Sequence, residues 1–321
     1  MDATATSEPL FVGIDVSKDR LDVALHPKGE TFTITRDAAG IDALAARLLP
    51  LGPATVALEA TGGYEMVVAA SLTSTGLPVA VVNPAQIRAF AQALGRRAKT
   101  DPIDAAVIAR FAATTRPAVR PLPDEATQRL ADLVGRRRQI IAMMVAERQR
   151  LARTTAPRLR RSIERLLPAL QRELSEVDGE IDQEVRGSPA WREKEDLLAS
   201  VPGVGPIIAR TLIAELPELG QVGRHAIAAL AGLAPWTRQS GQWKGRSYIG
   251  GGRAAVRTAL FMGAITAARH NPVLRAFRQG LLDRGKPKMV ALIAVARKLL
   301  TILNAIARSG EPWRPTMTAS A

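Results

Sequence analysis

The chain has 321 residues, of which 47% are hydrophobic, and it contains no cysteine. The length predicts two or three domains with sizeable cores, and the lack of cysteine excludes disulfides and thiolate metal sites. The first ten residues lack the basic start and apolar run of a signal peptide, and no stretch has the roughly 18 uninterrupted apolar residues of a membrane helix. We therefore expect a cytoplasmic protein without membrane contact.

The net charge of +14 is distributed unevenly along the chain. Residues 1–118 carry eleven Lys or Arg and twelve Asp or Glu, whereas residues 219–310 carry fifteen Lys or Arg and a single acid, Asp283. This contrast favours chemistry in the first part and polyanion binding in the last. The alternative is a basic, soluble surface without a specific partner. The ratio of fifteen basic residues to one acid makes this the weaker interpretation.

The first part of the chain alternates strand and helix patterns. Period-two alternation and short apolar runs predict strands, and helical periodicity predicts the segments between them. The predicted elements are strands at 11–15, 20–25 and 30–35, a helix at 41–49, a strand at 54–58, a helix at 64–74, a strand at 78–82 and a helix from Pro84. An antiparallel meander followed by αβ units predicts an α/β domain with a mixed sheet.

Four carboxylates occupy notable places in this domain. Asp15 ends the first strand and Glu59 follows the strand after the first helix, and strand ends are where α/β sheets bind ligands. Asp101 and Asp104 share one face of a helix that Pro102 opens. Such a set of acids can hold two Mg²⁺ ions for phosphoryl transfer. Taken alone, the Asp101–Asp104 pair is more typical of a helix cap that complements the helix dipole.

The middle of the chain is rich in Arg and Leu and is predicted to be helical over 124–185, with a break at Pro157 that favours a hairpin. Its apolar residues recur as in a coiled-coil seam. Residues 126–172 carry twelve Arg and three acids, and residues 173–184 carry six acids and no base. Two interpretations stay open: the arginines lie along nucleic-acid phosphates, or they pair with the acids of the second helix.

The last part contains two motifs between predicted helices. Residues 197–215 read as helix, Pro-Gly-Val-Gly, helix, the pattern of a helix-hairpin-helix. Gly203 and Gly205 permit a tight turn whose N–H groups can hold a phosphate, and a plain turn is the alternative. A polar, basic, Gly-rich segment at 237–246 contains Ser240, which by its spacing alone is a turn residue. Helices are predicted at 226–234, 254–269, 272–283 and 286–308.

The sequence resembles the insertion-sequence-110 family of DEDD transposases in four blocks. They are Gly13-Ile14-Asp15-Val16-Ser17-Lys18, Glu59-Ala60-Thr61-Gly62, Asn83-Pro84 and Lys99-Thr100-Asp101-Pro102-Ile103-Asp104-Ala105. The resemblance implies a RuvC-like, ribonuclease-H-type domain in which Asp15, Glu59, Asp101 and Asp104 bind Mg²⁺. We divide the chain into a RuvC-like domain (1–118), a helical coiled-coil segment (119–190), a mainly α C-terminal transposase domain with the helix-hairpin-helix (191–310) and a tail (311–321).

In this family the C-terminal domain carries a Ser-Gly motif after a segment similar to Gly232-Leu233-Ala234-Pro235, and its serine joins covalently to DNA. The resemblance therefore implies that Ser240 is the nucleophile. No base lies nearby in the sequence, so metals or carboxylates must be supplied from elsewhere, and the DEDD site of the same chain or of another protomer is the obvious source. The expected nucleic-acid contacts are Arg238, Lys244 and Arg246, at the scissile phosphate or along the backbone, and Gly203, Gly205, Arg253, Arg257, Lys286 and Lys288.

The resemblance further implies a recombinase that moves an insertion sequence. It would be a bacterial, nucleoid-associated dimer or tetramer that acts on donor and target DNA and is guided by an element-encoded RNA. Two other interpretations stay open from the residues. One is a hydrolytic, junction-resolving nuclease in which Ser240 is only a turn residue, and the other is a nucleic-acid-binding protein with a degenerate RuvC-like domain. The intact set of four acids speaks against the last.

Overall fold

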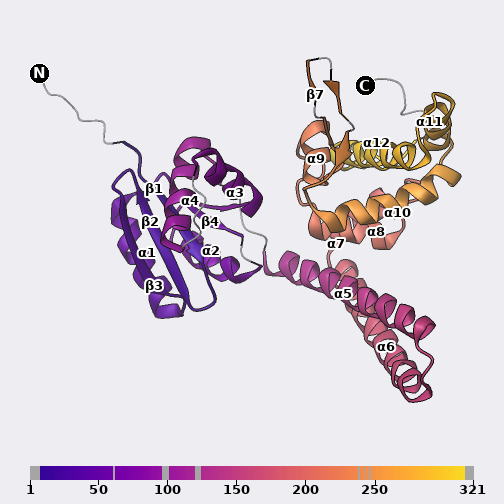
Figure 1. Ribbon diagram of the computed structural model, residues 1–321, viewed down its shortest axis with the longest axis horizontal. Coiled ribbons are helices and arrows are strands. Elements are labelled where there is room, and N and C mark those ends of the chain that lie inside the picture. Colours follow the sequence, from indigo (N-terminus) through magenta and orange to yellow (C-terminus); the bar gives the residue numbers. More distant parts are fainter. Residues whose placement is uncertain are drawn as a thin grey trace, which may run out of the picture. The chain divides into compact units, whose positions relative to one another are not determined.

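The computed structural model describes residues 8–60, 62–95, 101–119, 124–237, 239–241, 243–245 and 247–314, and for residues 101–103, 243 and 244 the backbone alone. The chain divides into two compact units, Met1–Leu122 and Pro123–Ala321. Figure 1 colours the first unit indigo to purple and the second magenta to yellow.

The N-terminal unit is a five-stranded mixed sheet in the order β3-β2-β1-β4-β5. The pairs β1–β2 and β2–β3 are antiparallel, and the pairs β1–β4 and β4–β5 are parallel. The elements are β1 (Phe11–Val16), β2 (Arg20–His26), β3 (Glu30–Thr35), α1 (Ala38–Leu48), η1 (Leu49–Leu51), β4 (Thr55–Glu59), α2 (Tyr64–Ser74), β5 (Val79–Val82), α3 (Pro84–Ala93) and α4 (Asp101–Thr115). The predicted α/β class with a mixed sheet is confirmed.

The two faces of this sheet are covered by different helices, because successive side chains of a strand point to opposite faces. Val12 and Ile14 of β1 pack with α1 and α2 in the larger core of the unit. Phe11 of β1 and Ala57 of β4 pack on the other face, against α3 and α4. Each helix thereby buries one apolar side, which is why the sequence shows helical periodicity between the strands.

Helix α4 lies directly against β1 at Gly13. A Cβ atom on Gly13 would stand 2.2 Å from the backbone nitrogen of Ala109 and 2.3 Å from the carbonyl oxygen of Ala105. Only a residue without a side chain permits so close an approach of two backbones. Ala24 of β2 packs with the same two alanines, so small residues surround the point of closest approach.

The C-terminal unit begins with the predicted helical hairpin, formed by α5 (Glu125–Arg153) and α6 (Pro157–Gly187). The helices meet along an apolar seam of Leu130, Val134, Ile140, Met144, Val177, Ile181 and Val185. Three ion pairs join the helices beside this seam: Arg129–Glu184 at 3.0 Å, Arg136–Glu173 at 3.8 Å and Arg137–Asp178 at 2.6 Å. For these arginines the structure supports pairing with the acids of the second helix.

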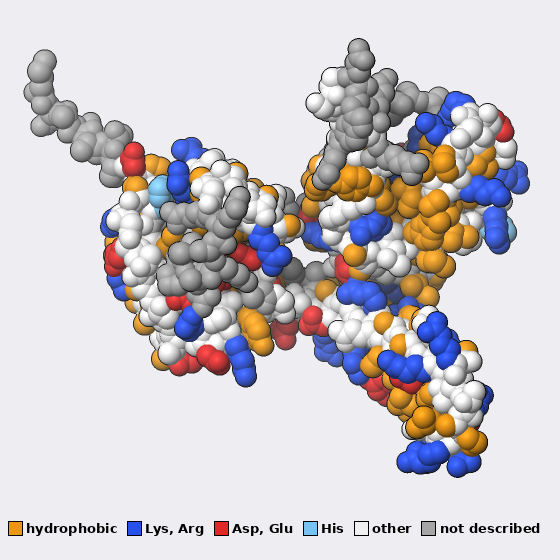
Figure 2. Space-filling view, in the orientation of Figure 1, with side chains coloured by type: hydrophobic (Ala, Val, Ile, Leu, Met, Phe, Trp, Pro, Cys, Tyr) orange, Lys and Arg blue, Asp and Glu red, His pale blue; other side chains and the backbone are white. Residues whose placement is uncertain are grey.

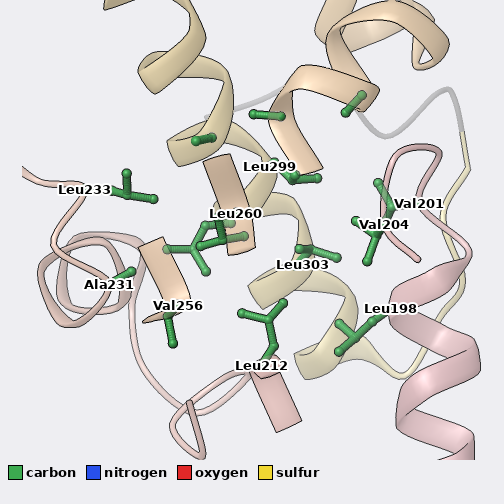
Figure 3. Close-up of a cluster of buried hydrophobic side chains, with 14 of the residues drawn as sticks. Leu198, Val201, Val204, Leu212, Ala231, Leu233, Val256, Leu260, Leu299 and Leu303 are labelled. Carbon is green, nitrogen blue, oxygen red and sulfur yellow. The ribbon is translucent and has the colours of Figure 1, made fainter. Parts of the chain in front are cut away.

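The rest of the unit is a helical bundle around α12. Its helices are α7 (Pro189–Ala199), α8 (Pro206–Glu215), α9 (Arg224–Leu230), α10 (Ala254–His270), α11 (Pro272–Asp283) and α12 (Lys288–Ser309). Figure 3 shows Leu299 and Leu303 of α12 among side chains from α7, α8 and α10. Within the described residues, α12 alone is long and apolar enough to cross a membrane, and half of its most apolar window is buried inside this core.

An ionic network ties the bundle to the hairpin. The Arg210 guanidinium of α8 contacts Glu195 of α7 at 2.7 Å and Asp182 of α6 at 2.8 Å. Burial of Arg210 works to lower its pKa, but the hydrogen bonds to the two carboxylates outweigh burial, so the pKa is raised from its ordinary value. The hairpin is thus fixed to the bundle by charge as well as by apolar contact.

We expect Gly13→Ala to lower the free energy of unfolding of the N-terminal unit by at least about 1–3 kcal/mol, the usual cost of overpacking a core. The added methyl group meets backbone atoms of α4, which cannot move aside as a side chain can. Urea denaturation followed by circular dichroism measures the change. The matched control is Gly135→Ala in α5, where a Cβ meets nothing within 4 Å. An unchanged stability of Gly13→Ala would contradict the close contact.

Candidate active site

Asp15 and Glu59 lie on one face at neighbouring strand ends. Asp15 alternates with Phe11 and Gly13 along β1, and Glu59 alternates with Ala57 along β4, so both belong to the face that α3 and α4 cover. The parallel strands pair up to Ile14 and Leu58, so Asp15 and Glu59 stand one step beyond the last pair. The predicted meeting of these acids at the strand ends is consistent with this register.

Asp104 approaches this face from the start of α4. Asp104 directly precedes Ala105 in α4. The carbonyl oxygen of Ala105 is one of the backbone atoms that a Cβ on Gly13 would meet. The contact therefore brings the first turn of α4 onto β1, two residues before Asp15. Helix α4 begins at Asp101, one residue before the predicted opening at Pro102, and the side chain of Asp101 lies outside the described residues.

The donor atoms of the described acids suit a divalent metal ion. Asp15, Glu59 and Asp104 offer only carboxylate oxygens, which are hard donors suited to Mg²⁺ or Mn²⁺ rather than to softer ions. Among the side chains that the structure describes, no three His, Cys, Asp or Glu residues gather closely enough to hold a metal ion. The predicted metal-binding role of Asp15, Glu59, Asp101 and Asp104 stays a prediction.

A further acid, Asp22, lies opposite Asp15 in the β1–β2 ladder, and the sequence analysis missed it. Asp22 is only 4% exposed. One of its carboxylate oxygens accepts a hydrogen bond from the hydroxyl of Thr33 at 2.7 Å, and the other accepts one from Nε of Arg20 at 3.1 Å. The signal available in the sequence was an acid within the otherwise apolar run Leu21–Leu25, a place where an uncompensated charge is costly.

We expect Asp22→Ala to lower the free energy of unfolding by about 1–3 kcal/mol, because Thr33 loses its partner and Arg20 loses a charged acceptor. Thermal and urea unfolding of the purified variant measure this loss. Asp42→Ala removes an exposed carboxylate from α1 of the same unit and serves as the control, with an expected change within about 0.5 kcal/mol. Equal stabilities of the two variants would show that Asp22 does not support the folded sheet.

Ser240 lies on a β-ribbon of the C-terminal unit that the sequence analysis predicted only as a loop. The ribbon has two antiparallel pairs, β6 (Pro235–Trp236) with β9 (Tyr248–Ile249) and β7 (Gln239–Ser240) with β8 (Trp243–Lys244). Each strand has two residues, too few for alternation to reveal it. Ser240 is exposed and pairs with Trp243 across the end of the ribbon. Figure 1 shows β7 projecting from the bundle.

The base of the ribbon is held by two arginines that the sequence analysis assigned to phosphates. Arg253 forms a double ion pair with Glu218, with distances of 2.5 and 2.8 Å. Arg257 donates to the carbonyl oxygen of Gly251 at 2.6 Å. Both guanidinium groups therefore have partners within the unit, and their contact with nucleic acid stays a prediction.

The structure describes some of the remaining predicted nucleic-acid contacts and leaves others outside the described residues. Lys286 and Lys288 are exposed where α12 begins. Arg238 and Arg246 lie outside the described residues, as does the side chain of Lys244. Their roles stay predictions.

The two glycines of the predicted helix-hairpin-helix have different surroundings. Gly203 has a φ of +103°, and a Cβ there would stand 2.6 Å from the backbone of Ala267 in α10, so this glycine serves packing. Gly205 precedes α8 with nothing near its Cβ position. Exposed Ile207 and Met262 lie beside this turn. Phosphate binding at the turn stays a prediction, and the apolar side chains beside it add no positive charge.

Positive charge gathers at the tip of the α5–α6 hairpin. Figure 2 shows Lys and Arg side chains there. Arg158, Arg161 and Arg165 surround Glu164 on α6 near the tip. These side chains remain candidates for contact with phosphates, in contrast to the paired arginines nearer the bundle.

An α/β unit with acids at adjacent strand ends, followed by a basic helical unit, is typical of enzymes that act on nucleic acids. Family comparisons give a more specific result. Residues 12–155 match a family model described as a transposase of the DEDD, IS110 type, and residues 195–279 match one described as a transposase of the IS116/IS110/IS902 family. The chain belongs to the IS110 family of transposases.

Individual relatives agree with this assignment. The chain is 30% identical to the pilin gene-inverting protein of Moraxella bovis over 317 residues, which cover 94% of this chain and 97% of the relative. It is 29% identical to a putative transposase of Sinorhizobium fredii, with coverage of 82% and 75%. An uncharacterized protein of the insertion element IS900 from Mycobacterium paratuberculosis is 28% identical over 54% of this chain and 42% of its own length.

Proposed function

We propose that the protein is a DNA transposase that moves an insertion sequence by cutting and rejoining strands through a phosphoserine link to Ser240. The observation that carries the proposal is the placement of Asp15 and Glu59 on the sheet face that the Asp104-bearing helix α4 covers. Family membership over both units supports it, as does the excess of basic residues around Ser240. Like the relative named for inverting a pilin gene, the protein would rearrange DNA.

The proposed chemistry is two exchanges at phosphorus. The oxygen of Ser240 attacks the phosphorus of a phosphodiester, so that a bond from phosphorus to serine forms while the bond to one sugar oxygen breaks. The serine proton passes to a carboxylate or solvent, and the departing sugar oxygen takes up a proton. A sugar hydroxyl of another strand then reverses the step and releases the serine. The phosphodiester bond energy is conserved, which agrees with the lack of a Gly-x-x-x-x-Gly-Lys-Ser/Thr motif.

The four acids would serve this exchange by holding Mg²⁺. Asp15, Glu59, Asp101 and Asp104 are the proposed ligands of two ions, and when bound the ions supply positive charge at the attacking and departing oxygens. The protein's own contribution is to hold two carboxylates on the sheet and to bring the start of α4, which carries the other two, against that face. Asp22, which binds Arg20 and Thr33, fixes the strand that pairs with β1 beside Asp15.

Several finer features of the proposal rest on the family resemblance and on charge. Donor and target DNA are the proposed substrates, and the basic C-terminal unit suits both. Guidance by an element-encoded RNA and assembly into a dimer or tetramer follow from the resemblance, since joining two DNA molecules needs several protomers. The proposed location is the bacterial cytoplasm, in association with the nucleoid.

The nucleophile is tested by Ser240→Ala on a nicked DNA substrate from which a cleaved fragment cannot rejoin. We expect the wild-type protein to form a covalent protein–DNA adduct with Mg²⁺, and the variant to lose it by at least about 10³-fold, as removal of a nucleophile does. Denaturing electrophoresis of labelled DNA measures the adduct. Ser247→Ala removes another exposed hydroxyl from the same ribbon and is expected to keep the adduct. Hydrolytic cleavage that survives in Ser240→Ala would instead indicate a junction-resolving nuclease.

The metal site is tested by the single substitutions Asp15→Asn, Glu59→Gln and Asp104→Asn. Each is expected to reduce strand cleavage by about 10²-fold or more, because the charge that holds the ions is lost. Binding of Mn²⁺, followed by electron paramagnetic resonance, should weaken in parallel while circular dichroism stays unchanged. Asp42→Asn, on the exposed side of α1, should leave both measurements as in the wild type. Full cleavage by any of the three variants would remove that residue from the site.

A further inference from the structure

Two aromatic rings stack on the outside of the ribbon that carries Ser240. Trp236 of β6 and Tyr248 of β9 are cross-strand partners, with ring centroids 6.2 Å apart and planes inclined by 27°. Trp236 is 55% exposed and Tyr248 is 45% exposed. The sequence contains only four Trp and two Tyr residues, so one third of them belong to a pair that adds little to the core.

The rings rest on a fixed support. The Trp236 ring lies over Gly251, at 3.6 Å from the position of a Cβ on that residue, and the carbonyl oxygen of Gly251 is held by Arg257. Ile249 of the same ribbon packs against the core of the bundle. Exposed aromatic surface held in place in this way is prepared for a partner, because ordering the rings costs nothing further on binding.

The sequence on either side of the pair favours a negatively charged partner with flat rings. Arg238 lies two residues after Trp236, and Arg246 lies two residues before Tyr248. The nearest acid after Glu218 in the sequence is Asp283. Aromatic faces interleaved with cations are the features with which proteins hold single-stranded nucleic acid, since bases stack on the rings while the cations follow the phosphates.

Another exposed apolar place of this unit fits such a partner less well. Ile207 and Met262, beside the turn before α8, are 53% and 56% exposed. Both are aliphatic and present no ring on which a base could stack. A protein partner would suit that place, whereas the stacked, exposed Trp236–Tyr248 pair presents ring faces to a base.

We propose that Trp236 and Tyr248 form a stacking platform for an unpaired nucleobase of the DNA strand that Ser240 attacks. Ser240 follows Trp236 by four residues on the same ribbon, so a base on the platform would belong to the strand beside the attacked phosphate. The inference rests on the proposed function for its choice of strand. It adds a binding site that holds the strand locally unpaired at the point of cleavage.

The test measures the coupling between the ring and the base. Full-length protein carrying Ser240→Ala, which cannot be trapped on DNA, is titrated into fluorescein-labelled oligothymidylate and into an abasic oligodeoxyribose phosphate of equal length, with anisotropy as the readout. We expect the protein with Trp236 to prefer the oligothymidylate by about 10-fold, the usual effect of one stacked base. Trp236→Ala should lose this preference, and Trp236→Phe should retain most of it.

A matched variant distinguishes base stacking from a general loss of binding. Met262→Ala removes an exposed apolar side chain elsewhere on the unit and should keep the preference. A Trp236→Ala protein that binds both oligomers as before, or that loses equal affinity for both, would overturn the platform. So would a preference for oligouridylate RNA over the DNA oligomer, or a change in oligomeric state as the main effect. If the preference for oligothymidylate is observed as expected but the wild-type protein forms no adduct at Ser240, the serine mechanism is refuted and the stacking platform is retained.

Discussion

The backbone contact between α4 and β1 at Gly13 is the constraint on which the acidic site depends. The four proposed ligands come from three separate elements, and only a close approach of the helix to the sheet can join them. Gly13 supplies that approach because no Cβ stands between the strand and the backbone of Ala105 and Ala109. The contact is also rigid, since it joins two regular elements through backbone atoms. A site for divalent metals benefits from such rigidity, because its ligands must keep like charges close together.

The C-terminal unit carries a short β-ribbon on a well-packed helical bundle. Apolar side chains of α7, α8, α10 and α12 make up most of its core (Figure 3), with Thr211 and Asn304 as buried polar residues, and the ribbon leaves the core between α9 and α10. Glu218 pairs with Arg253 at the foot of the ribbon, where the charge of the guanidinium is neutralised. The sequence between Glu218 and Asp283 contains no acid to balance its basic residues. Charge is thus compensated where it supports structure and left in excess where polyanions are expected to bind.

Paired and less fully paired arginines also lie in different parts of the α5–α6 hairpin. Near the bundle its arginines pair with acids of α6, and Arg210 extends that network to α7 and α8. Toward the tip, Arg158, Arg161 and Arg165 lie around the single carboxylate of Glu164. The structure therefore supports ion pairing for the arginines near the bundle, whereas phosphate contact at the tip, where Arg160 also pairs with Glu164, stays a prediction.

The sequence by itself determined the α/β unit, the hairpin break at Pro157 and the helices of the bundle, because each depends on local periodicity and on proline. It also placed Asp15 and Glu59 at strand ends. Only the tertiary structure decided that Gly13 admits α4, that Asp22 stands opposite Asp15, and that Trp236 stacks on Tyr248. These features depend on strand register and on contacts between residues far apart in the chain, which leave no periodic signal. The ribbon strands are two residues long, and so their existence was set by pairing across space rather than by any pattern along the sequence.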